Sequence, residues 1–413
     1  MKGIPWWVVA VAAAISLGAA WLLKEPCIDT PWNDHFQYRQ YCYSDVQALW
    51  TGKGLDGDAV QYVEADNEYP VLTGWFMQGV AFLTTGLHDY MVLSFVLLLA
   101  CGAGTTLGLW RAGVPGELVL AWCIVPTLPI HGLTNWDLIA VVCAVWGWVL
   151  WRRGHPLWSA LLFGLGGSAK LYPAFFLPFL FLGALKARDR RTAARVFLGG
   201  FLGLGLPNLV AAWMSWDGWF ATWVFHAGRH PDFETPWQAF FEHFLRPVFP
   251  DYDWDTSWRH LVDRISLTAM LATTVWLGTR VWNRRLDGLV AGGAFSLAFL
   301  LVNKVYSPQY TLWAVPLLLL LGAAWRPLLL FVTADFANFL VRYRLFTPPA
   351  GQSEGWNSAW DDWSLLAINA RWVFLAWATW TVVRRYGLER IGEAPGPKGP
   401  DAKGQDTPLP EAA

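Results

Sequence analysis

The sequence predicts an all-α polytopic membrane protein, and three observations lead to this fold class. Of its 413 residues, 55% are hydrophobic and only 15% are charged, which gives more apolar surface than a soluble domain can bury. Segment after segment reaches the roughly 20 apolar residues needed to cross about 30 Å of hydrocarbon. No long stretch alternates as a β-strand does. Helices fit such spans because they satisfy their backbone hydrogen bonds within one segment.

We expect twelve crossings and one re-entrant segment, with both termini in the cytoplasm. Residues 116–131 are short and contain Pro126 and Pro129, so we expect them to enter and leave on the same side. Arg152 and Arg153 then lie inside with the other basic clusters, in agreement with the positive-inside rule. The predicted spans are 5–23, 69–87, 90–110, 134–151, a hairpin at 156–185, 195–213, 265–282, 287–303, 308–323, 327–340 and 365–384.

Two large outer loops, 24–69 and 214–264, are expected to carry short interfacial helices. The membrane domain covers residues 1–390, and the Pro-, Gly- and Ala-rich tail at 391–413 is expected to be disordered in the cytoplasm. In the first loop, an oxidising exterior makes a disulfide between Cys27 and Cys42 possible.

Charge and composition exclude several other functions. A net charge of −1 without a basic block argues against nucleic acid as a partner. No CxxC motif or His/Cys cluster predicts a structural metal. Many of the 30 Trp stand at span ends, where they favour the membrane interface, although some in the outer loops are suited to stacking on sugar rings.

Charged and polar groups are costly at membrane depth and usually serve a function. Those in or beside the apolar segments collect on the predicted outer side. They are Asp45, Gln47, Glu68, Tyr69, Asn135, Asp137, Lys170, Tyr172, His226, Arg229, His230, Asn303, Lys304, Tyr306 and Gln309.

Asp45 is the candidate catalytic carboxylate. It begins an amphipathic helical turn that Ser44 is placed to cap. A partly shielded carboxylate there can accept a proton from an acceptor hydroxyl, as general-base catalysis requires. The alternative is that Asp45 only helps to cap a surface helix.

Three cations, Lys170, Arg229 and Lys304, are predicted at the depth of the outer leaflet. Fixed positive charges can stabilise a phosphate that leaves with growing negative charge. For the two lysines the alternative is snorkelling to the interface.

Two further groups also have structural alternatives. The stretch from His226 to Asp232 suits head-group binding or a hydrogen-bonded turn. Asn135 and Asp137 suit ligand binding or the start of a helix, near its positive dipole end.

Several motifs in this order resemble glycosyltransferase family 87. They are Tyr-Ser-Asp at 43–45, Glu-Tyr-Pro at 68–70, Asn-Trp-Asp at 135–137, Gly-Gly-Ser-Ala-Lys-Leu-Tyr-Pro at 166–173 and Asn-Lys-Val-Tyr-Ser-Pro-Gln-Tyr at 303–310. The resemblance covers about residues 5–385. The family has the GT-C fold and includes mycobacterial α-1,2-mannosyltransferases that use polyprenyl-phosphate mannose.

The resemblance implies an inverting, metal-independent transfer of a sugar, commonly mannose, from a polyprenyl-phosphate donor. Asp45 corresponds to the family's catalytic Asp, and no cofactor is expected. The acceptor is expected to be a glycolipid or glycan at the outer face of the plasma membrane. The alternative function is a multi-pass transporter or flippase, whose charges would face a path open to both sides.

Overall fold

The computed structural model describes residues 3–28, 30–57, 59–249, 254–349 and 357–387. Within these ranges the regular structure is helical and contains no β-strand. Gln61 and Ala65 form one isolated β-bridge. The prediction of an all-α protein is therefore confirmed. The tail predicted to be disordered, 391–413, lies outside the described residues.

Four stretches of helix are long and apolar enough to cross a membrane, as expected for a membrane protein. They are Trp6–Cys27, Leu87–Arg111, Arg190–Met214 and Ser358–Arg385. Shorter apolar helices occupy Val71–Phe82, Tyr172–Lys186 and Gly288–Val302.

The first helix, α1 (Trp6–Lys24), is accompanied along its whole length by α6 (Gly116–Ile124) and α7 (Thr127–His131). Gly116 lies against Ile4, just before α1 begins, while Ile130 packs in one cluster with Leu23, near its end. The expected half-pass at 116–131 is therefore wrong, because the segment extends from one end of α1 to the other. Pro126 divides the two helices because it cannot donate a backbone hydrogen bond.

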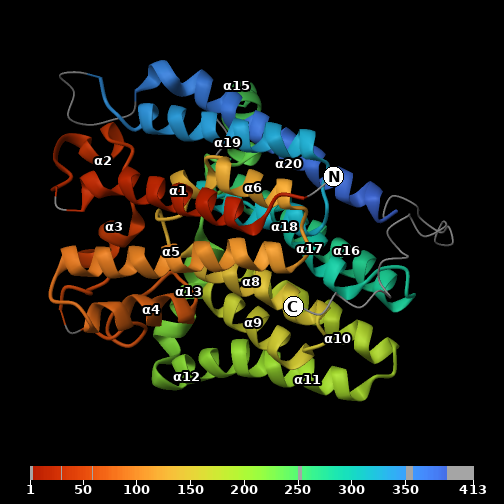
Figure 1. Ribbon diagram of the computed structural model, residues 1–413. Helices are drawn as coiled ribbons and strands as arrows, with labels where there is room; N and C mark the ends of the chain where they lie inside the picture. The colour runs from red at the N-terminus through yellow and green to blue at the C-terminus, as the bar shows by residue number, and fades with distance from the viewer. Residues whose placement is uncertain (1–2, 29, 58, 250–253, 350–356, 388–413) are drawn as a thin grey trace.

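Helix α5 (Leu87–Arg111) runs antiparallel to α1 (Figure 1). Near its beginning, the Tyr90 ring lies 4.6 Å from that of Trp50 in the first outer loop. Near its end, the Trp110 ring lies 5.4 Å from that of Trp6.

This direction corrects the expected crossing at 69–87. Helix α4 (Val71–Phe82) is only about 18 Å long at 1.5 Å per residue. It starts beside Tyr62 of the outer loop, and α5 then begins at the same end of the bundle. The crossing lost at 69–87 and the crossing gained at 116–131 cancel in the count. Arg152 therefore still lies at the end of the bundle where α1 begins.

The other helices of the bundle overlap the segments predicted as spans and provide the wall behind the site. They are α8 (Asp137–Arg152), α9 (Pro156–Ala169), α10 (Phe176–Lys186), α11 (Arg190–Gly200), α12 (Leu206–Met214), α16 (Trp254–Trp282), α17 (Gly288–Val302), α18 (Thr311–Leu320), α19 (Trp325–Leu345) and α20 (Asp361–Arg385). A π-helical turn, Phe201–Gly205, joins α11 to α12.

Glycines allow α9 and the α11–α12 segment to approach closely. A Cβ atom on Gly203 would lie 2.3 Å from the carbonyl oxygen of Leu161, and one on Gly199 would lie 2.3 Å from that of Leu157. Small residues permit this backbone contact between membrane helices, where lipid provides no hydrophobic force to drive association.

The two outer loops form short helices and dock on each other. The first contains α2 (Phe36–Arg39) and α3 (Asp45–Gly52), and Cys27 is joined to Cys42 by a disulfide. The second contains α13 (Trp216–Gly228), α14 (Pro236–Phe240) and α15 (Arg246–Val248).

One face of α13 makes the contact between the loops. A Cβ atom on Gly218 would clash with the Tyr62 carbonyl, Thr222 donates a hydrogen bond to the Asn67 carbonyl, and His226 bonds to that of Glu68. These residues recur at intervals of four, so they share one helix face.

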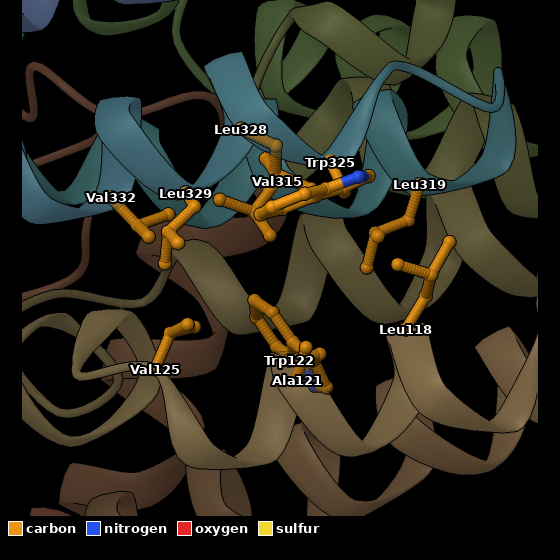
Figure 2. Close-up of a pocket in the computed structure, with 10 residues that line it drawn as sticks. All are labelled: Leu118, Ala121, Trp122, Val125, Val315, Leu319, Trp325, Leu328, Leu329 and Val332. Carbon is orange, nitrogen blue, oxygen red and sulfur yellow. The ribbon is translucent and has the colours of Figure 1, made fainter.

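An apolar cavity of about 250 Å³ lies between α6, α18 and α19. Figure 2 shows Trp122 of α6 and Trp325 of α19 on opposite sides of it, with leucine and valine side chains around them. Only apolar residues line this cavity, so it offers no group for acid–base or phosphate chemistry.

Candidate active site

A cavity of about 930 Å³ lies between the outer loops and the nearby helix ends, and it collects most of the residues singled out from the sequence. The predicted residues that line it are Asp45, Glu68, Tyr69, Asn135, Lys170, His226, Arg229, Asn303, Lys304 and Gln309. They come from segments far apart in the chain, so the fold brings them together.

Backbone contacts position Asp45 at the first turn of α3. Ser44 caps this helix, as predicted, by accepting a hydrogen bond from the Val46 amide at 3.3 Å. The Ser44 hydroxyl also donates to the Leu133 carbonyl at 2.7 Å, and the Asp45 amide donates to that of Thr134 at 2.8 Å. The start of α3 is therefore fixed to the turn between α7 and α8.

Both oxygens of the Asp45 carboxylate accept hydrogen bonds. The Tyr43 hydroxyl donates to Oδ1 at 2.7 Å, and the Asn135 amide donates to Oδ2 at 2.5 Å. The Tyr69 hydroxyl lies 3.5 Å from Oδ2. Burial raises the pKa of Tyr43, and the Asp45 charge raises it further, so Tyr43 stays protonated and can donate.

Lys170 lies in the cavity wall between α9 and the short 3₁₀ turn Tyr172–Phe175. Its Nζ is 3.7 Å from an oxygen of Asp137 and 4.3 Å from the centre of the Tyr69 ring. The other Asp137 oxygen accepts a hydrogen bond from Trp313 at 2.7 Å. Lys170 is buried and held by these groups, so it does not snorkel.

Lys304 follows α17 and is also buried. Its Nζ lies 2.7 Å from Asp263 of α16 and donates to the Ala227 carbonyl at 3.0 Å. Arg229 faces Asp232 at 3.5 Å. Each of the three predicted cations thus has a carboxylate partner.

Five predicted site residues are not among those that line the cavity. Asp137 lies behind Lys170, and Tyr172 is buried with its ring stacked on Trp313 at 4.6 Å. Tyr306 is buried beside Thr311 at 3.3 Å. Gln47 is half-buried on α3, and His230 is exposed in the second outer loop.

Asn135 does not cap α8, because Trp136 occupies the N-cap position. Its side-chain oxygen accepts a hydrogen bond from the Trp136 amide at 2.6 Å, while its amide group reaches Asp45. One side chain therefore shapes the start of the helix and orients the carboxylate.

Sequence reasoning missed Asp263, Trp219 and Trp223, all of which line the cavity. Asp263 lies near the amphipathic beginning of a long helix. An acidic residue at such a place is usually interpreted as part of the solvated surface. The two Trp were grouped with interfacial aromatics. Their position one turn apart on α13, beside His226, is a signal that would have separated them.

The structure is that of a helical membrane protein whose outer loops enclose a carboxylate and three cations around one cavity. The sequence model of glycosyltransferase family 87 matches residues 69–308, more than half of the chain. The chain therefore belongs to glycosyltransferase family 87, and this membership implies a glycosyltransferase activity. No curated protein and no solved structure matches the chain.

The matched range includes Asn135, Lys170, Arg229 and Lys304 but begins after Asp45. The link between Asp45 and the matched region is therefore structural. It consists of the hydrogen bonds from Asn135 and Tyr69.

Proposed function

We propose that this glycosyltransferase moves a sugar from a polyprenyl-phosphate donor to a glycolipid or glycan acceptor. Mannose is the sugar that the resemblance to glycosyltransferase family 87 leads us to expect. The observation that carries the proposal is that Asp45 and the three cations line one cavity. A carboxylate and a set of cations within one cavity suit a reaction that removes a proton at one place and releases a phosphate at another.

In the proposed reaction, Asp45 accepts the proton of the acceptor hydroxyl. The oxygen of that hydroxyl forms a bond to the anomeric carbon of the sugar, on the face opposite the phosphate. The bond between that carbon and the phosphate oxygen breaks, and its electron pair leaves with polyprenyl phosphate. The configuration at the anomeric carbon is inverted, and the step uses no metal or cofactor.

Lys170, Arg229 and Lys304 stabilise the leaving phosphate in this proposal. Cations that are fixed before the reaction lower the barrier more than cations that must reorganise during it. Trp219, Trp223 and Phe225, which line the same cavity, provide an apolar side for the first isoprene units of the donor.

We also propose that the chain adopts the GT-C fold with twelve crossings and that the cavity opens to the exterior of the plasma membrane. The basic clusters at Arg152–Arg153 and Lys186–Arg195 support this orientation, because positive residues favour the cytoplasmic side. The acidic first outer loop lies at the other end of the bundle.

The test is an assay of the purified chain with a panel of polyprenyl-phosphate sugars and a membrane extract, followed by mass analysis of the products. We expect the wild-type chain to transfer one sugar, with an inverted anomeric configuration by NMR. Asp45→Asn should fold and insert normally but lose at least about a hundredfold in rate, as is typical when a general base is removed.

Asp66→Asn is the matched control, because Asp66 is an exposed carboxylate of the same loop outside the cavity. It should transfer sugar at the wild-type rate. Full activity in Asp45→Asn would exclude Asp45 as the base. If the protein instead moved the lipid-linked sugar across the membrane of reconstituted vesicles and formed no product, the result would support a flippase.

A further inference from the structure

A buried group of charged side chains lies behind the cavity and takes no part in the reaction proposed above. Glu234, Asp335 and Arg371 have side chains that are only 1% exposed. Glu234 belongs to the second outer loop, whereas Asp335 lies in α19 and Arg371 in α20. Isolated charges are very costly to bury, so such a group persists only when its members are well paired.

Glu234 is held by donors from two helices. Arg371 donates to one of its carboxylate oxygens at 2.7 Å, and Arg342 donates to the other at 2.5 Å. Asn338 adds a bond at 2.9 Å, and Arg371 also reaches the Glu234 carbonyl at 3.0 Å. Burial alone would raise the pKa of Glu234, but the two arginines outweigh it and lower the pKa, so the carboxylate is ionised.

The Glu234 anchor lies two residues from the backbone bond that leads to the site. The Asp232 amide donates to the Lys304 carbonyl at 2.8 Å, and the Asp232 carboxylate faces Arg229 at 3.5 Å. The Lys304 amino group in turn reaches the Ala227 carbonyl at 3.0 Å. Two hydrogen bonds therefore join Lys304 to the segment from Ala227 to Glu234, and an ion pair joins Arg229 to Asp232 within that segment.

We propose that Glu234, clamped by Arg371 and Arg342, is a positioning residue that fixes Arg229 and Lys304 for the donor phosphate. The inference rests on the proposed function and adds to it a residue that touches no substrate. The cations must be fixed in this way because each belongs to an irregular segment outside the regular helices. A displacement of about 1 Å in a positioning group can cost roughly a hundredfold in rate.

The experiment compares the wild-type chain with Glu234→Gln, which keeps the shape of the side chain but removes its charge. Binding of polyprenyl monophosphate, without sugar, is measured by thermal shift, and KM is measured separately for donor and acceptor. We expect Glu234→Gln to raise the donor KM and to weaken carrier binding by about tenfold or more. The acceptor KM should remain within about twofold of wild type.

Glu242→Gln is the matched control, because Glu242 forms an exposed ion pair with Arg246 in the same outer loop. It should leave both KM values unchanged. A folded Glu234→Gln with wild-type donor KM and carrier binding would overturn the positioning role, and so would equal changes in both KM values.

If Glu234→Gln does not fold, Asn338→Ala decides. It removes one hydrogen bond to Glu234 and leaves both arginines in place. A donor KM raised severalfold with an unchanged acceptor KM supports the inference, and an unchanged donor KM overturns it. A wild-type chain that binds no polyprenyl phosphate but still transfers sugar would instead reject the proposed donor.

Discussion

Asp45 accepts hydrogen bonds on both carboxylate oxygens, and the donors come from different parts of the chain. Tyr43 is a near neighbour in sequence, whereas Asn135 is ninety residues away. The orientation of the carboxylate therefore depends on the first outer loop and on the start of α8 together.

We expect Tyr43→Phe to reduce kcat by roughly tenfold, because a hydrogen bond to a charged group is worth on the order of 1.5–3 kcal/mol. Tyr41→Phe is the control, since Tyr41 belongs to the same outer loop and its ring stacks on that of Tyr343 at 5.2 Å. A wild-type kcat in Tyr43→Phe, with Tyr41→Phe also unchanged, would contradict the role assigned to this hydrogen bond.

The sequence predicted the polar residues that stand beside apolar segments, such as Asn135, Lys170 and Lys304, because charge and amide groups are unusual there. It did not reveal the partners of Lys304 and Arg229, since Asp263 and Asp232 are ordinary acidic residues in polar stretches. Arg371 and Asp335 could have been recognised as unusual from the sequence. Each lies inside a segment predicted to cross the membrane, where a charge calls for an explanation.

At the scale of helices, the contact between α9 and the α11–α12 segment depends on the absence of a side chain at Gly203. We expect Gly203→Leu to destabilise the protein by about 3 kcal/mol or more, at the upper end of the usual cost of overpacking. The contact is with a backbone carbonyl, which cannot move aside as a side chain can. The measurement is the midpoint of thermal unfolding in detergent.

Gly18→Leu provides the comparison within a membrane helix, because a Cβ atom on Gly18 meets nothing within 4 Å. Its unfolding midpoint should match that of wild type. Equal stability of the two leucine variants would show that α9 can move away from the α11–α12 segment.

The existence of the helices was predicted well, but the direction of α5 was not. Apolar length identified α5 and α20. It could not show that the chain after α4 stays at the same end of the bundle, whereas the divided pair α6–α7 leads from one end to the other. Pro126 suggested a half-pass, whereas packing along α1 compensates for the break in the helix. That compensation depends on contacts with residues such as Ile4 and Leu23, which no local pattern reports.

For the whole molecule, the corrected direction of α5 gives a direct test of topology. We expect a cysteine in Gly86→Cys to react with a membrane-impermeant maleimide in intact cells, because this position lies at the end of the bundle with the outer loops. A Cβ atom there meets nothing within 4 Å, so the substitution should be tolerated.

Arg152→Cys should react only after the membrane is permeabilised, and the wild-type chain provides the background from native cysteines. Protection of the cysteine in Gly86→Cys in intact cells would restore a crossing between residues 69 and 87. Reaction of both variants from outside would reverse the assigned orientation of α8.

The pairing of Lys170, Arg229 and Lys304 with Asp137, Asp232 and Asp263 has a consequence for competition by simple ions. Because these opposite charges balance, sulfate or inorganic phosphate gains little electrostatic free energy on binding. Each anion would have to displace an aspartate from its cation. A ligand with a long hydrocarbon tail gains the additional free energy of apolar contact. Selection against the abundant salts of the surroundings would then come from the tail that such anions lack.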